Sequence, residues 1–349
     1  MGEDIKTTKT KAVEMTDHLT WVNTAKGIGI VLVVLGHVLV GLNGAGLIYD
    51  KKMYLIIFDI IYSFHMPLFF FLSGLFFLHS YTKRGALLLI GNKTATIIYP
   101  FVIWSAIQII IEASLANYTN NDESFSHLLT MFLYPKSQFW FLHALFLMFV
   151  FNALLFTILK QWAVWIATLV TVCLFIFQDQ LFANMAIVDN VTRNLIYFNT
   201  GIVWAYVVKS FRPGTTTVIL SVTFFVALIY SEFIWIHIPL SEASLLFVLA
   251  AALTGIGMII TISMHRYNLL ERSMKVFGRY SMEIFIMHIL FASGIRIVLQ
   301  KFFGIQEFYL HLLIGMLAGL LLPLAVLYMI NRFHLHFLLQ PPRWMSTKL

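Results

Sequence analysis

The sequence predicts an all-α fold, a polytopic bundle of about 10 transmembrane helices with both termini on the cytoplasmic side. Of the 349 residues, 60% are hydrophobic and 11% are charged, and the mean hydropathy is +0.86. A soluble domain carries about 25% charged residues, so this chain has too few to cover a water-exposed surface. The composition therefore excludes a soluble enzyme, a disordered regulator and a disulfide-bonded secreted scaffold.

Apolar runs of about 20 residues recur along the whole chain, and none shows the strict alternation of a membrane barrel. The ranges predicted to span the membrane are 22–42, 53–79, 94–114, 139–159, 161–179, 191–209, 215–236, 244–264, 280–300 and 309–331. Residues 1–20 form a polar N-terminal segment and residues 332–349 a C-terminal tail. No linker rich in Pro, Gly or Ser separates a second unit, so residues 1–349 are expected to form a single domain.

The Lys and Arg residues are distributed unevenly between alternate loops. With the N-terminus inside, 17 of the 23 fall on the cytoplasmic side and 6 on the other. This bias predicts a multi-pass protein of the plasma (inner) membrane, in contact with lipid, with both termini in the cytoplasm. It also accounts for the net charge of +7, so we expect no nucleic-acid partner.

Two ionisable residues of the first predicted span lie on one helix face. Lys26 and His37 are 11 residues apart, which is about three full helical turns and about 16 Å along the axis. Lys26 lies at the cytoplasmic end, where it can bind phosphate, and a neutral His37 could accept a proton from a hydroxyl group. The alternatives are a membrane-interface lysine and a buried histidine that bonds a neighbouring helix.

The second predicted span carries Asp59 and His65 in an otherwise apolar run. Pro67 frees a backbone carbonyl near His65, and Gly74 permits close approach of another helix. Asp59 enters from the outer side and could orient His37. A solvent-facing Asp59 at the outer end of the helix explains the residue equally well.

The last two predicted spans contain features that we interpret as structural. Arg279 and Glu283 have the spacing of a helical ion pair. His288 is expected to pack or to form a hydrogen bond within the bundle. Gly315 and Gly319 have the spacing of a close helix contact.

Four short runs, in this order, resemble acyltransferase family 3, a family of ten-span membrane O-acyltransferases. They are Lys26-x10-His37, the run from Phe64 to Gly74, Phe139-Trp-Phe-Leu142, and the run from Phe277 to His288. The resemblance extends from about residue 17 to residue 335. It is nearest to the sugar and polysaccharide O-acetyltransferase branch. Two positions depart from the family pattern, since Lys26 replaces an Arg and Thr96 replaces the second Arg of an Arg-x-x-Arg pair.

The resemblance implies transfer of an acyl group, usually acetyl, from cytoplasmic acyl-CoA to a sugar hydroxyl. His37 would be the general base, assisted by Asp59. The cations expected to bind the CoA phosphates are Lys26, Lys83, Arg84 and Lys93. The residues assigned to the acceptor are His65, Trp140, Arg193 and Asn194. The oxyanion donor is left open between Tyr62, Ser63 and Trp140.

No nucleotide-binding loop, His-Glu-x-x-His motif or cysteine cluster is present, since Cys173 is the single cysteine. We therefore expect no metal and no permanently bound cofactor, with acetyl-CoA acting as a co-substrate. The partners expected are acyl-CoA, a glycan acceptor and lipid, and a homo-oligomer is left open. The alternative function is a non-enzymatic carrier or exporter of a glycan or lipid-linked sugar, in which the membrane-embedded His and Asp serve binding or proton coupling.

Overall fold

The computed structural model describes residues 2–115, 124–182, 186–208, 210–231, 239–265 and 271–342. Within these ranges the chain is helical and contains no strand. The long helices are α1 (Gly2–Gly44), α2 (Lys51–Leu75), α3 (Phe77–Lys93), α4 (Tyr99–Ser114), α6 (Trp140–Leu159), α7 (Ala163–Phe182), α8 (Ala186–Val207), α9 (Thr215–Ile229), α10 (Leu245–Met264), α12 (Ser281–Ile297) and α13 (Phe308–Arg332). The short ones are α5 (His127–Thr130) and α11 (Glu271–Arg279). The all-α fold is therefore confirmed.

Each of the ten predicted ranges overlaps one of the long helices. Among the described residues, 7 helical stretches are long and apolar enough to cross a membrane. They are Thr20–Gly44, Lys51–Leu75, Phe77–Ser114, Ser137–Gln178, Leu245–Met264, Ser281–Phe302 and Phe308–Arg332. Thr215–Ile229 is apolar but shorter.

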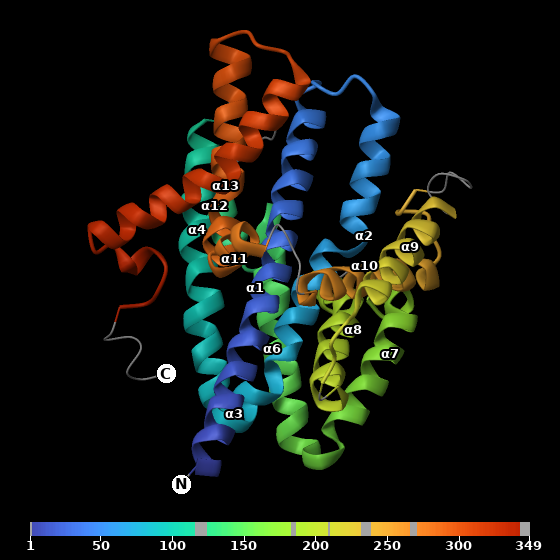
Figure 1. Cartoon of the computed structure of the whole chain (residues 1–349). Helices are drawn as coiled ribbons and strands as arrows, with labels where there is room; N and C mark the ends of the chain where they lie inside the picture. Colours follow the sequence, from blue (N-terminus) through green and yellow to red (C-terminus); the bar gives the residue numbers. More distant parts are fainter. Residues whose placement is uncertain are drawn as a thin grey trace.

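The two longest of these stretches are not single straight helices. Lys160 adopts φ 49° and ψ −118°, and this conformation ends α6, so that α7 runs back beside it (Figure 1). In the other stretch Gly85 has φ 72° and ψ 173°, a conformation that interrupts α3 and that glycine adopts without steric strain. The turn at Lys160 falls between the predicted ranges 139–159 and 161–179, and Gly85 lies between 53–79 and 94–114.

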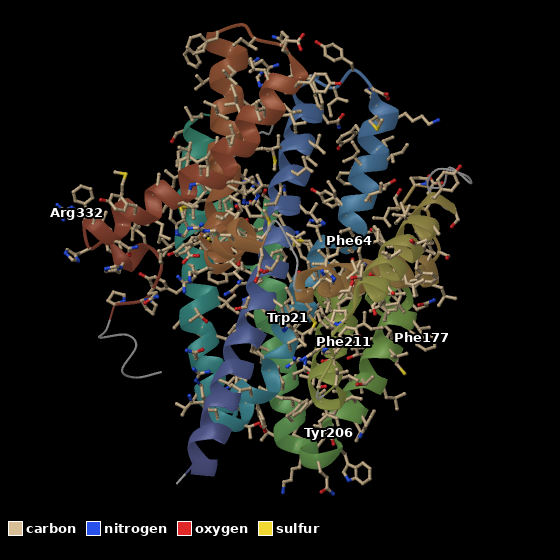
Figure 2. The ribbon with its side chains drawn as sticks, in the orientation of Figure 1. Trp21, Phe64, Phe177, Tyr206, Phe211 and Arg332 are labelled. Carbon is tan, nitrogen blue, oxygen red and sulfur yellow. The ribbon has the colours of Figure 1, made fainter. Side chains whose placement is uncertain are left out.

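Large apolar side chains cover the outside of the bundle as well as its interior. Trp21 and Phe64 are buried, whereas Phe177 and Tyr206 are about half exposed at the periphery (Figure 2). Exposed aromatic and aliphatic side chains on many helices would associate in water but are stable against lipid. The apolar surface thus agrees with the membrane environment that the composition predicts.

Helix α1 extends along most of the molecule and packs against α2, α10, α11, α12 and α13 (Figure 1). Glycines permit these contacts. A Cβ on Gly278 of α11 would lie 1.7 Å from the carbonyl oxygen of Asn23 in α1. Gly315 and Gly319 of α13 face Val38 and Val34 of α1, which confirms the predicted close contact.

Helices α2 and α8 approach each other equally closely. A Cβ on Gly74 would lie 2.0 Å from the carbonyl oxygen of Phe198, so the expected close approach at Gly74 is confirmed. We expect Gly74→Ala to lower the thermal unfolding temperature in detergent by several degrees, because the added methyl group meets backbone that cannot move without separating the helices.

Gly257→Ala is the matched control for that prediction. Gly257 also lies within a helix, α10, but no atom stands within 4 Å of the position of its Cβ. Alanine should be neutral or stabilising there, by up to about 1 kcal/mol, through its higher helix propensity. Equal unfolding temperatures for the two variants would contradict the described α2–α8 contact.

The ion pairs of the described residues do not include one between Arg279 and Glu283, so that prediction is wrong. Helix α11 ends at Arg279, Tyr280 has φ −105° and ψ 22°, and α12 begins at Ser281. Because the helix is interrupted between the two residues, four-residue spacing no longer places them on one face.

Candidate functional site

A cavity of about 580 Å³ lies between α1, α2, α6, α7, α8, α10 and α12. Five of the residues that the sequence assigned to the site line it: His37, His65, Trp140, Arg193 and Asn194. The structure thus brings together residues from four helices that are separated by up to 157 positions in the sequence. None of the predicted phosphate-binding cations lines this cavity.

His65 presents one ring nitrogen to the cavity in a defined state. Its Nδ1 lies 2.7 Å from the carbonyl oxygen of Ile61, one turn earlier in α2. A carbonyl only accepts, so Nδ1 carries the hydrogen and Nε2 is left as an acceptor. Pro67, two residues later, also lines the cavity and cannot donate a backbone hydrogen bond.

A second histidine, His288 of α12, lies directly against His37. The two ring centroids are 5.1 Å apart, and His288 is fully buried. Its Nδ1 lies 2.8 Å from the carbonyl oxygen of Phe285 and 3.1 Å from that of Ile284. These bonds confirm the expected role of His288 within the bundle. They also leave its Nε2 as a buried acceptor, with no hydrogen-bond partner among the residues that the structure describes.

Aromatic rings fix the positions of the side chains around the histidines. Tyr62 meets the His65 ring edge-on, with centroids 4.7 Å apart. Phe285, one turn before His288 in α12, packs against Phe141 of α6 at 5.2 Å. Rings in these tilted and edge-on arrangements have few alternative rotamers, so the cavity wall is largely preformed.

The three residues considered as oxyanion donors, Tyr62, Ser63 and Trp140, all line the cavity. The Ser63 hydroxyl donates to the carbonyl oxygen of Ile60 at 2.8 Å. Its single hydrogen is therefore already engaged. Tyr62 and Trp140 are the stronger candidates that remain.

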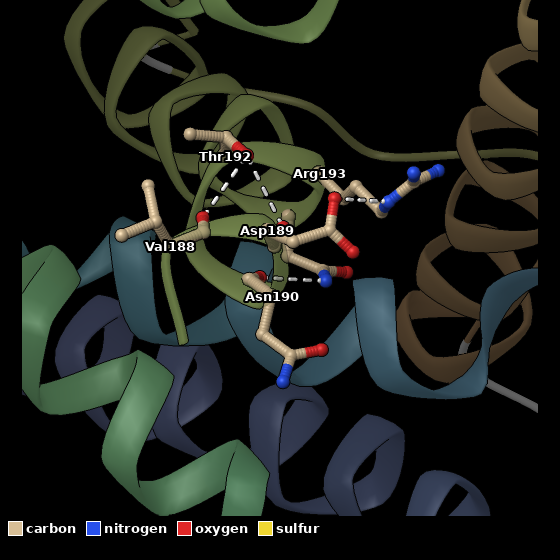
Figure 3. Close-up of polar contacts among 6 residues, drawn as sticks. Val188, Asp189, Asn190, Thr192 and Arg193 are labelled. Carbon is tan, nitrogen blue, oxygen red and sulfur yellow. Dashed lines mark hydrogen bonds and ion pairs between the residues drawn. The ribbon is translucent and has the colours of Figure 1, made fainter. Parts of the chain in front are cut away.

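The first turns of α8 supply a polar wall (Figure 3). Arg193 Nε donates to Asp189 Oδ1 at 2.6 Å, and the Asn194 amide donates to the carbonyl oxygen of Asn190 at 3.0 Å. Tyr197 follows one turn later and is buried. Helical spacing places these three side chains on one side of α8, and two of them, Arg193 and Asn194, are residues that the sequence assigned to the acceptor.

Asp59 contacts a different partner from the one expected. Its Oδ2 accepts a hydrogen bond from the backbone N–H of Leu240 at 3.3 Å. Leu240, Ser241 and Ala243 belong to the loop before α10 and line the cavity. Asp59 therefore holds a wall of the cavity, rather than lying in solvent at the end of α2.

Three of the four predicted phosphate-binding cations lie near one another. Lys26 and Arg84 are close enough to Lys93 for their charges to repel its ammonium group. Lys93 Nζ stands 4.1 Å above the ring of Phe149, and Lys26 Nζ is 5.9 Å from the ring centroid of Phe76.

No carboxylate forms an ion pair with these three cations in the described part of the chain. Like charges gathered without anions favour binding of a polyanion. Lys83 is exposed and is not among the charges that act on Lys93.

The sequence reasoning missed Gln138, Gln178 and Ser241, which also line the cavity. A signal for the two glutamines was available, because Gln138 directly precedes the predicted span 139–159 and Gln178 lies within the predicted span 161–179. Buried amides in such positions form hydrogen bonds to other helices or to ligands.

Comparison with known proteins places the whole bundle in one family. The family model of the acyltransferase domain, acyltransferase family 3, matches residues 19–328. No curated protein and no solved structure matches the chain. The match begins at the start of the apolar part of α1 and ends within α13, so it includes every helix that lines the cavity. The chain belongs to acyltransferase family 3 and is a multi-pass membrane acyltransferase.

Proposed function

We propose that the protein transfers an acetyl group from cytoplasmic acetyl-CoA to a hydroxyl of a sugar, surface polysaccharide or glycolipid. The observation that carries this proposal is the position of His37. It lines a cavity rich in amide, hydroxyl and guanidinium groups, about 11 residues along α1 from a cluster of unpaired cations. Such a cavity suits a polyhydroxylated acceptor.

The cations Lys26, Arg84 and Lys93 would hold the CoA phosphates. Because Lys26 and His37 project from one face of α1, a pantetheine arm bound along that face would carry its thioester about 16 Å to His37. Lysine forms a point contact with phosphate, so the Lys26 that replaces the family's Arg still supplies charge but not bidentate geometry.

The reaction balances with no further reactant. His37 accepts the proton of the acceptor hydroxyl while its oxygen attacks the thioester carbonyl. Tyr62 and Trp140 would donate hydrogen bonds to the oxyanion. The carbon–sulfur bond then breaks, and the departing CoA sulfur takes the proton from the His37 imidazolium.

His288 would act as a positioning residue in this scheme. Its Nδ1 hydrogen is committed to backbone carbonyls, so its Nε2 can only accept, and the His37 ring lies beside it with its centroid 5.1 Å away. Accepting a hydrogen from His37 would fix its tautomer and leave the other nitrogen free to act as the base.

The topology that we propose has ten membrane crossings, with both termini in the cytoplasm of the inner membrane. It follows from the distribution of Lys and Arg and from the ten helices that overlap the predicted ranges. Under this topology the cation cluster faces cytoplasmic acetyl-CoA, and the cavity opens toward the opposite side.

The test of the proposal is transfer by the purified full chain in proteoliposomes. With labelled acetyl-CoA and a glycan-containing membrane extract, we expect label in the glycan and release of CoA that depends on the extract. Failure of the chain to bind acetyl-CoA would overturn the proposal in favour of a carrier. Binding of acetyl-CoA with no labelled glycan would exclude glycans as the class of acceptor.

Lys26 variants test the donor site separately. Lys26→Ala should raise the KM for acetyl-CoA by about fivefold or more through loss of one phosphate contact, whereas Lys26→Arg should retain or increase activity. Arg212→Ala is the control, because Arg212 is an exposed cation in the α8–α9 connection. Unchanged donor kinetics in Lys26→Ala would make Lys26 a membrane anchor only.

A further inference from the structure

Two buried glutamines and a glutamate form a chain of hydrogen bonds that ends at the cavity. The Gln138 amide nitrogen donates to Gln108 Oε1 at 2.8 Å, and the Gln108 amide nitrogen donates to Glu112 Oε1, also at 2.8 Å. Gln138 lies in the helical turn Ser137–Phe139 that precedes α6, and the other two residues lie on α4. Both glutamines are at most 3% exposed.

The chemistry of the three side chains fixes which group donates and which accepts in each of these hydrogen bonds. A carboxylate can only accept, so the amide nitrogen of Gln108 must face Glu112. The amide oxygen of Gln108 then faces Gln138. Because that oxygen only accepts, Gln138 must donate to it through its amide nitrogen. The remaining group, the Gln138 Oε1, is buried and accepts no hydrogen bond from the described part of the chain.

Gln138 itself lines the cavity, and so does Gln178 of α7. Gln178 is 1% exposed, and neither its amide oxygen nor its amide nitrogen has a hydrogen-bond partner in the described part of the chain. Buried polar groups in folded proteins are nearly always satisfied. Two residues that line one cavity therefore carry three buried, unsatisfied amide atoms, which points to a ligand that supplies the missing bonds.

We propose that Gln138 and Gln178 form a subsite for two hydroxyl groups of an uncharged, polyhydroxylated part of the acceptor. This inference rests on the proposed function, which makes the cavity the binding site for the acceptor. The Gln138 oxygen accepts from one hydroxyl, and the Gln178 amide both donates to and accepts from another. Neither hydroxyl is the one acylated, since that group must reach His37.

The fixed donor and acceptor roles in this series of hydrogen bonds make the subsite selective for hydroxyl groups over anions. The unpartnered atom of Gln138 is an oxygen, so a carboxylate or phosphate of the ligand beside it would place an acceptor against an acceptor. An uncharged hydroxyl has the hydrogen that this oxygen requires. Trp140, two residues later, supplies an apolar ring against which the C–H groups of the same ligand can pack.

Three variants test the subsite and one serves as the matched control. Gln138→Met and Gln178→Met remove the polar groups with little change in volume. Gln108→Met leaves the cavity lining intact but frees the Gln138 amide to turn. Asn152→Leu, which has the same branched shape, is the control, since Asn152 of α6 is a fully buried amide that does not line the cavity and whose oxygen has no partner among the described residues.

In the proteoliposome assay we expect Gln138→Met and Gln178→Met to raise the KM for the acceptor at least about tenfold and to leave the KM for acetyl-CoA unchanged. Gln108→Met should have a smaller effect in the same direction. Asn152→Leu should match the unmodified chain. An unchanged acceptor KM in both cavity variants, or an effect on the donor KM alone, would overturn the inference.

Binding is measured without catalysis by saturation-transfer NMR of methyl glucoside and methyl glucuronide with the purified chain. We expect transfer to methyl glucoside that exceeds transfer to the glucuronide and that is lost in Gln138→Met. Equal transfer to both probes, or transfer unaffected by Gln138→Met, would refute the subsite. Selective binding of the glucoside together with absent acyl transfer would refute the proposed function and retain the subsite.

Discussion

His37→Gln is expected to lower kcat for acyl transfer by about 100-fold to 10,000-fold while acetyl-CoA still binds. Glutamine occupies a similar volume and retains hydrogen bonding, but it cannot take a proton from a hydroxyl at neutral pH. The attacking oxygen would then keep its proton, and the thioester would be stable beside it. The measurement is the rate of acceptor-dependent CoA release at saturating acetyl-CoA, with donor binding measured separately by equilibrium dialysis.

His143→Gln is the control for that experiment. His143 is a half-buried histidine of α6 that packs near the ring of Phe101, and it does not line the cavity. Its replacement should leave the rate within about twofold of the unmodified protein. Full activity of the His37→Gln protein would exclude His37 as the base, even if the protein proved to be an acyltransferase.

His288→Leu is expected to reduce kcat by about tenfold to 100-fold with unchanged KM values for both substrates. The substitution removes the nitrogen that can accept from His37, so the His37 ring would lose its fixed tautomer and orientation. His288→Gln should restore part of the rate, because its side-chain oxygen can accept in place of Nε2. A merely structural role would lower the amount of folded protein instead.

The two His288 variants are therefore compared at equal amounts of folded protein, determined by size-exclusion chromatography. If both variants keep the full kcat per folded molecule, the contact between the rings of His37 and His288 has no positioning role. If the Leu and Gln variants lose kcat to the same extent, the accepting nitrogen is not the property that matters.

Most of the helical architecture could be predicted because it depends on local sequence. The apolar runs and their polar boundaries placed a helix within each of the ten predicted ranges. The exception is informative: hydropathy and spacing favoured an Arg279–Glu283 pair, but the helix is interrupted at Tyr280. A break of that kind depends on how α11 packs against α1, where Gly27 and Gly278 bring the backbones together.

The candidate site was predicted in part. Lys26 and His37 share a face of one helix, a relationship that a helical period reveals directly. Asp59 was correctly singled out as an unusual residue, but its partner is Leu240, 181 residues away. No local pattern specifies a contact at that separation.

The sequence by itself determined that this protein is a helical membrane protein of acyltransferase type, since composition and short motifs carry that information. Only the tertiary structure decided that His37, His65, Trp140, Arg193 and Asn194 line one cavity, that the rings of His37 and His288 lie together, and that Gln138 joins the cavity wall. The physical reason is that a helix forms from bonds within one segment. A cavity wall depends instead on which helices approach one another, and close packing at positions such as Gly74 and Gly278 decides that.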